Sequence, residues 1–88
     1  MTWELHLAGC HSLKDKRHVL KSLKDRLHNR FNVSAAETDH HDAWQRAEVT
    51  VCVVSTDRDH AERVLREADR LVAAEGDARI VDTSTSYL

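Results

Sequence analysis

Two different spacings of apolar residues alternate along this chain, and their order constrains the fold more than any other feature. Residues 2–8 and 46–55 place apolar side chains at every second position, as a strand with one buried face does. Residues 12–31 and 57–76 instead repeat apolar residues at helical spacing. Residues 32–39 and 78–88 are predicted as further strands, so the elements follow the order βαββαβ.

Capping residues support both helix predictions. Ser12 followed by Asp15 forms a capping box at the start of the first helix, and Asp57 is a typical N-cap for the second. The apolar pattern of the first helix ends within residues 29–32, and the second helix is predicted to end at Gly76. Both helices therefore carry sequence signals that set their boundaries.

This order of elements predicts an α+β fold, a ferredoxin-like βαββαβ sandwich. Right-handed crossovers arrange the strands as a four-stranded antiparallel sheet in the order 4-1-3-2, with both helices on one face. The chain has no proline and no linker-like segment, so residues 1–88 are predicted to form a single domain. Three loops share one end of this topology, where these residues are expected to be neighbours: Cys10, His11, His40, His41, Asp42 and Trp44. The Trp44 ring is expected to seal the end of the core.

Composition excludes several classes of function. Aromatic residues make up only 5% of the chain, and a small aliphatic core of this kind rarely encloses a deep ligand pocket. Cys10 and Cys52 lack the CxxC spacing of a zinc or redox site and are predicted to be reduced thiols. The apolar run at 49–54 is far too short to cross a bilayer, and the N-terminus does not resemble a signal peptide. We therefore expect a cytoplasmic protein with no membrane partner and no cofactor.

The charges are divided unevenly between the first helix and the rest of the chain. Residues 11–30 contain seven Lys or Arg residues against two Asp, whereas the remainder contains six against thirteen acidic residues. The second helix is balanced, because its arginines are matched in number by acidic residues. On a helical wheel, five basic residues of the first helix form a continuous stripe: Lys14, Arg17, Lys21, Lys24 and His28. Lys16, Arg26 and Arg30 are expected to add flanking charges.

A stripe of this kind either solubilises the helix or binds an anion. Charged helix faces usually only contact solvent, but the separation of sign along this chain favours a surface for a polyanion. The stripe spans roughly 20 Å at about 1.5 Å per residue, enough for several backbone phosphates of a nucleic acid. Ser12 begins the helix beside His11, where unpaired N–H groups would suit one phosphate.

The predicted open face of the sheet favours phosphate contacts over base stacking. It would carry Glu4, His6, Ser34, Ala36, Thr50, Cys52 and Thr83, and none of them is a Phe, Tyr or Trp that could stack on a base. Binding to structured RNA or a ribosomal subunit would then depend strongly on salt and little on sequence. The same face or the edge strands could instead pair with a second copy of the chain or with a protein partner.

Two further possibilities rest on weaker patterns. His40, His41, Asp42 and Cys10 offer ligand types that suit Zn²⁺, but no specific ligand spacing accompanies them, and polar loop residues are the simpler interpretation. Cys10 and His11 lack an orienting third group for nucleophilic catalysis. We therefore predict neither a metal site nor a catalytic site, and the protein is not expected to be an enzyme.

Three segments of the chain resemble one known family. The stretches "SLKDKR" at 12–17, "RFNVSAAE" at 30–37 and "DHHDAWQRA" at 39–47 are similar to the YlxP-like family of small bacterial proteins, a domain-of-unknown-function family. Asp15 stands where the family pattern has Glu, and Cys10, His11 and His41 are not part of that pattern. The resemblance implies the ferredoxin-like fold and no established activity. Family members often lie in operons beside genes for translation initiation and ribosome maturation, which by association implies a ribosome or RNA partner.

Overall fold

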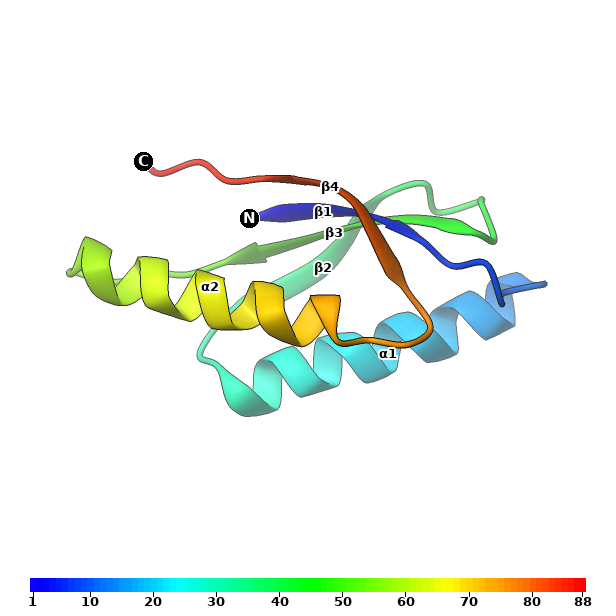
Figure 1. Ribbon diagram of the computed structural model, residues 1–88, viewed down its shortest axis with the longest axis horizontal. Coiled ribbons are helices and arrows are strands. Elements are labelled where there is room, and N and C mark those ends of the chain that lie inside the picture. Colours follow the sequence, from blue (N-terminus) through cyan, green and yellow to red (C-terminus); the bar gives the residue numbers. More distant parts are fainter.

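The protein consists of two layers, a four-stranded sheet and two helices that cover one of its faces (Figure 1). The computed structural model describes residues 1–88. The elements, in chain order, are β1 (Thr2–His6), α1 (Leu13–Arg30), β2 (Ser34–Asp39), β3 (Arg46–Cys52), α2 (Arg58–Ala73) and β4 (Arg79–Ser84). All neighbouring strands are antiparallel, in the order β2-β3-β1-β4. The predicted ferredoxin-like α+β arrangement is confirmed.

The core lies between the sheet and the helices as one cluster of 15 buried residues. Trp3 and Leu5 of β1 and Val49 and Val51 of β3 point into it because alternate residues of a strand face the same side. The helices supply Leu20, Leu23 and Leu27 from α1 and Leu65, Ala68 and Val72 from α2. The core is thus largely aliphatic, as the composition predicts. Neither helix has the length and apolar composition that a membrane span needs.

The predicted caps begin both helices. The Asp15 N–H donates to Ser12 Oγ at 3.0 Å, and the Asp59 N–H donates to Asp57 Oδ1 at the same distance. The end of α2 differs from the prediction, because the helix stops at Ala73 and Gly76 does not adopt a positive φ. The Ala74 N–H closes the last turn by donating to the carbonyl oxygen of Arg70, so no left-handed glycine is needed.

An irregularity in β4 changes which side chains reach the open face of the sheet. Glu4 pairs with Asp82 and Leu5 with Ile80, so Val81 is an extra residue in β4. An extra residue reverses the alternation of side chains beyond it. Thr83 therefore pairs with Trp3 on the helix-covered side, and its expected place on the open face is wrong. The other residues expected there are on that face.

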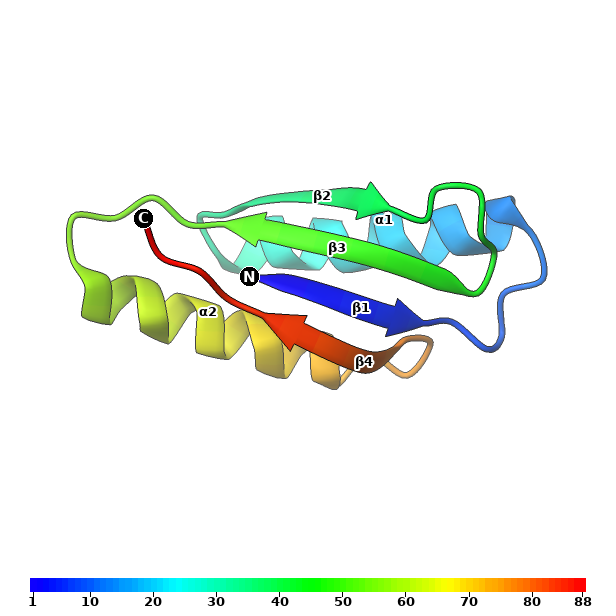
Figure 2. The same ribbon diagram turned by 90° about the horizontal axis from the view of Figure 1, so that it is seen from above.

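Three loops meet at one end of the molecule, as the topology predicts (Figure 2). They are the β1–α1 loop, the β2–β3 hairpin loop and the α2–β4 loop. The first two are directly hydrogen-bonded, because the Leu7 N–H donates to the Gln45 carbonyl oxygen at 2.9 Å. The Gln45 side chain also donates from Nε2 to the carbonyl oxygens of Ala8 and Cys10, both at 3.2 Å. The hairpin loop is thereby fixed against the chain that leads into α1.

Candidate functional site

One side of α1 carries a continuous row of basic residues, which we call the basic flank: Lys14, Arg17, Lys21, Lys24 and His28. The opposite side of α1 is directed toward α2, since Arg26 forms an ion pair there with Glu75. The flank begins at a hollow of about 500 Å³, which Lys14, Arg17 and Lys21 line together with Asp15 and with Asp77 of the α2–β4 loop. It ends at His28, next to the start of β2. Of the flank residues, only Lys24 is partly buried and the others are exposed.

Few acidic groups neutralise the basic flank. Lys21 Nζ lies 2.7 Å from Asp25 Oδ2, and both side chains are exposed. The hydrogen bond from Lys21 lowers the pKa of the Asp25 carboxyl below its usual value. Lys14, Arg17 and Lys24 form no ion pair. These three cations are therefore unpaired, and the nearest acidic residues around Lys14 and Arg17 are Asp15 and Asp77, which line the same hollow.

His28 closes the flank at the end of α1. Its Nδ1 donates a hydrogen bond to the carbonyl oxygen of Val33 at 3.0 Å, just before β2 begins. This contact fixes the imidazole ring against the start of the edge strand. The Nε2 atom makes no hydrogen bond within the protein, so the ring can take part in a contact made by the flank.

Lys16 is not part of this exposed surface, so the prediction that it supplies a flanking charge is wrong. Only 1% of its surface is exposed. Its ammonium group lies 2.6 Å from the carbonyl oxygen of His40, 2.7 Å from that of Ala43 and 3.1 Å from that of Arg46. It also lies 2.8 Å from Glu37 Oε2. A buried ammonium needs such partners, and here the partners are the backbone of the hairpin loop.

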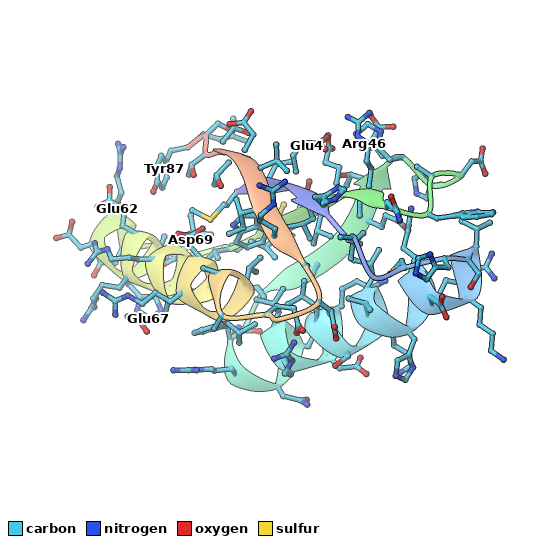
Figure 3. All side chains as sticks on the ribbon, turned by 45° about the vertical axis from the view of Figure 1, so that its right-hand side comes forward. Glu4, Arg46, Glu62, Glu67, Asp69 and Tyr87 are labelled. Carbon is cyan, nitrogen blue, oxygen red and sulfur yellow. The ribbon has the colours of Figure 1, made fainter.

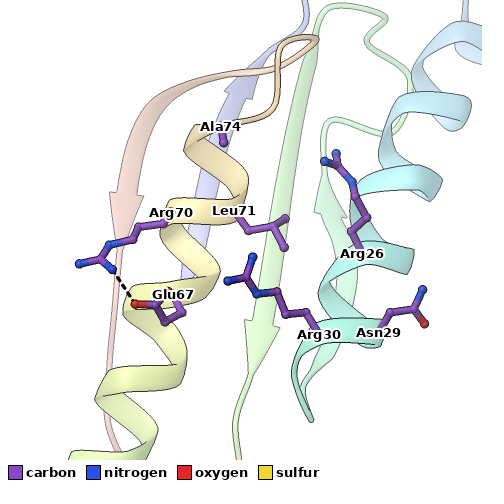
Figure 4. Close-up of a pocket in the computed structure, with 7 residues that line it drawn as sticks. All are labelled: Arg26, Asn29, Arg30, Glu67, Arg70, Leu71 and Ala74. Atoms are coloured by element: carbon purple, nitrogen blue, oxygen red, sulfur yellow. Dashed lines mark hydrogen bonds and ion pairs between the residues drawn. The ribbon is translucent and has the colours of Figure 1, made fainter.

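Arg26 and Arg30 also lie away from the basic flank, on the side of α1 that faces α2 (Figure 4). They line a hollow of about 620 Å³ together with Arg70 and Leu71 of α2. Each arginine already has a partner, since Arg26 pairs with Glu75, Arg70 with Glu67 at 2.7 Å, and Arg30 stacks on the Phe31 ring at 5.6 Å. The predicted flanking charges therefore belong to a separate, partly neutralised groove.

The start of α1 is less suited to a phosphate than the sequence predicts. The Asp15 carboxylate accepts a hydrogen bond from the His11 N–H at 3.0 Å. A negative charge already lies at this helix end, where it is favoured by the helix dipole. His11 is exposed but stands beside that carboxylate, so the end of the helix offers less attraction to an anion than the flank does.

The structure does not bring the weaker metal candidates together. No group of three or more His, Cys, Asp or Glu side chains is arranged to hold a metal ion. Cys10 is buried, and this burial is the main reason that the pKa of its thiol is raised. His41 and Asp42 are exposed on the hairpin loop, whereas the His40 ring turns toward Glu4. The residues share one end of the molecule but not one coordination centre.

His40 belongs to a polar cluster on the open face of the sheet. Its Nε2 lies 2.6 Å from Glu4 Oε1 and 3.4 Å from Arg46 Nη2. Figure 3 shows Glu4 and Arg46 side by side on the face that the helices leave uncovered. Farther along the sheet the Thr50 hydroxyl lies 3.0 Å from that of Thr2 and 2.9 Å from that of Thr38. The open face is therefore polar and internally hydrogen-bonded.

Trp44 does not seal the core, and the prediction of that role is wrong. Its side chain lies on the hairpin loop with 54% of its surface exposed. A hollow of about 490 Å³ lies beside it and is also lined by His6, Asp42 and Arg46. Hydrophobic periodicity could not reveal this placement because residues 40–45 lie outside the regular elements. At this end of the molecule, the exposure of the Trp44 indole differs most from what the sequence predicts.

Comparison with known proteins places the chain among its relatives. Residues 1–85 match the model of a family described as "Protein of unknown function (DUF503)". The chain belongs to this family. It is 44% identical to the uncharacterized protein YlxP of Bacillus subtilis (strain 168) over 55 residues, which are 62% of this chain and 60% of that relative. The match thus spans less than two thirds of the relative's length. The YlxP-like resemblance is confirmed, and it leaves the partner of the basic flank to be proposed.

Proposed function

We propose that the protein is a non-enzymatic module that binds structured RNA, such as a region of a ribosomal subunit, through the basic flank of α1. The observation that supports this proposal is the lack of acidic partners for Lys14, Arg17 and Lys24. Side chains that only keep a helix soluble gain by pairing with acids of the same helix, as Arg58 and Arg70 do on α2. Arg63 and Arg66 of α2 form no such pair, but acidic residues match the arginines of that helix in number. Cations left unpaired along one flank are the arrangement that a polyanion requires.

The spacing of the flank suits a nucleic-acid backbone. Lys14 and Lys24 are ten residues apart, which is about 15 Å along a helix axis. Cations distributed over this length can contact several phosphates of one strand. A site for a single small anion would instead need the cations to point toward one place. Phosphate contacts fix position and carry little sequence information. We therefore infer recognition of RNA shape rather than sequence by this flank.

A protein partner is the second candidate, and the free edge of β2 favours it. This edge strand pairs with β3 on one side only, and unpaired strand edges are sites where a further strand can add. An acidic extended segment on β2 would meet the end of the basic flank at His28. A second copy of the chain could use the same edge, or the edge of β4, for self-association.

The direct test is to measure binding to structured ribosomal RNA fragments across a salt series. A variant with Lys14→Glu, Lys21→Glu and Lys24→Glu is compared with the wild type, and circular dichroism checks that both remain folded. Four to five neutralised phosphates predict a slope of about −3 to −4 in a plot of log affinity against log salt. The variant should lose binding. Absence of wild-type binding at low salt, with the fold intact, would reject the RNA proposal and favour a protein partner.

A further inference from the structure

An exposed tryptophan on the hairpin loop is the least expected feature of the surface. Trp3 is completely buried, whereas 54% of the Trp44 surface is exposed. Burying an aromatic ring is a large source of stability for a small domain, and this chain leaves one of its two tryptophans largely in solvent. No hydrogen bond of the loop uses the Trp44 indole N–H. Neither core packing nor the loop's hydrogen bonds therefore account for the ring.

The loop that carries Trp44 is held in one conformation. The Lys16 ammonium binds carbonyl oxygens of His40, Ala43 and Arg46, which lie before and after the ring in the chain. His40 adopts a φ of 62°, a left-handed conformation that is uncommon outside glycine but enriched in histidine. Its N–H donates to Asp39 Oδ1 at 2.7 Å and its carbonyl oxygen accepts from Lys16, which hold the residue in this conformation. The buried lysine thus presents Trp44 on a rigid support, which lowers the entropic cost of binding.

The surroundings of the ring fit a nucleotide. The hollow beside it, of about 490 Å³, is shallow and open to solvent, so it can receive one face of a base. Arg46 lies at its edge with 62% of its side chain exposed and its guanidinium 3.8 Å from Glu4 Oε2. An indole offers a flat surface for a base, and the Asp42 carboxylate can accept a hydrogen bond from an exocyclic amino group. An arginine suits a phosphate, but Arg46 is paired with Glu4, so a phosphate would have to compete with that carboxylate.

This hollow and the basic flank begin at the same end of the protein. The ammonium of Lys16 in α1 reaches the carbonyl oxygens of the loop, so the first turns of α1 lie within one lysine side chain of it. Figure 2 shows the hairpin loop and the start of α1 together at that end. The flank lies on the helix layer, whereas the hollow is lined by His6 and Arg46 of the open face of the sheet. An RNA that contacts both must therefore pass around this end of the protein from one layer to the other.

We infer that Trp44 stacks on one unpaired base of the bound RNA, with Arg46 contacting the adjoining phosphate. The inference rests on the proposed RNA-binding function and adds a preference to it. The flank contacts phosphates of a paired region, and the hairpin loop accepts a base that is not paired. The RNA partner is accordingly a duplex interrupted by a bulge or closed by a loop.

The test uses two RNA duplexes that differ in one base. One duplex contains a single bulged adenosine, and the other has an abasic nucleotide at that position, so the phosphates are identical. Stacking of a base on an aromatic side chain is worth about tenfold in affinity by order of magnitude. The wild type should bind the bulged adenosine about tenfold more tightly than the abasic duplex. Trp44→Ala should bind both duplexes with the affinity that the wild type has for the abasic one, and Trp44→Phe should restore part of the preference.

Three results would overturn this inference alone, and a fourth would overturn it together with the proposed function. Equal binding of both duplexes by the wild type would show that no base is recognised. A tenfold preference that survives in Trp44→Ala would place the base elsewhere, and an equal loss for both duplexes would show that Trp44 acts without the base. In each of these three cases the proposed function still stands if the wild type binds the RNA and the variant at Lys14, Lys21 and Lys24 does not. No binding to either duplex at low salt would reject both together and leave Trp44 as a contact for a protein.

Discussion

The two helices cover the same face of the sheet, but the charges of α2 are balanced and those of α1 are mostly positive. In α2, four arginines are matched by two Asp and two Glu, with ion pairs between Arg58 and Glu62 at 3.2 Å and between Arg70 and Glu67 at 2.7 Å. In α1, seven Lys or Arg residues face two Asp, and Lys21–Asp25 is the pair formed within the helix. Both helices have an N-cap and a buried apolar stripe. The two helices thus share these features of folding and differ in the excess charge of α1.

Each helix also turns one charged side chain inward. In α2, Asp69 Oδ1 accepts a hydrogen bond from Trp3 Nε1 at 2.8 Å, which connects the helix to β1. In α1, Lys16 connects the helix to the hairpin loop and to Glu37 of β2. Apart from Arg26 and Arg30, which line the groove beside α2, the cations of α1 are therefore of two kinds. Lys16 is buried among partners, and the basic flank is mostly exposed.

The largest expected effect separates these two kinds of cation. Lys16→Met leaves loop carbonyls and the Glu37 carboxylate without their buried partner, and removing one member of such a pair costs about 3–5 kcal/mol. Arg17→Met changes the next residue, which is exposed, and should change the free energy of unfolding by no more than about 0.5 kcal/mol. Urea unfolding of both variants measures the difference. Similar small losses in the two variants would contradict the structural role of Lys16.

A smaller effect is expected at the one acidic residue that pairs with the flank. Asp25 has a pKa below its usual value because Lys21 donates a hydrogen bond to it. Because the pKa is lowered in the folded state, Asp25 contributes to the stability of the fold at pH values above the usual aspartate pKa. This contribution is lost as the pH falls through the lowered pKa. A bound phosphate would draw Lys21 away and add negative charge, so RNA should raise the pKa of Asp25. Carbon-detected NMR titration of its carboxyl group, with and without RNA, measures the change. An unaltered Asp25 pKa in an RNA-saturated sample would show that Lys21 does not contact phosphate.

The fold could be predicted because the sequence repeats apolar residues at two clear periods. Trp3 and Leu5 alternate, and Leu20, Leu23 and Leu27 share a helix face, so burial followed from position alone. Lys16 occupies the same helix face as these leucines, but its charge led to the wrong prediction. Its position on the wheel was the available signal, since a cation on an apolar face must find buried partners.

Other features depended on contacts that no local pattern encodes. The extra residue Val81 reverses the second half of β4, and Gly76 and Asp77 in the preceding loop do not signal it. Trp44 lies in a loop whose path is set by Lys16, a residue 28 positions earlier in the numbering. The separation of Arg26 and Arg30 from the basic flank was predictable from the helical wheel. The ion pair of Arg26 with Glu75, in the loop after α2, required the packing of the two helices.

The measurement that tests the central claim most directly compares matched charge reversals on the two helices. Lys14→Glu/Lys21→Glu in α1 and Arg63→Glu/Arg66→Glu in α2 change the net charge equally, and all four residues are exposed. We predict that the salt slope of RNA binding becomes shallower by about 2 in the α1 variant, one for each lost phosphate contact. The α2 variant should retain the wild-type slope. Equal losses of affinity and slope in both variants would show that binding follows net charge, and would contradict a specific role for the basic flank of α1.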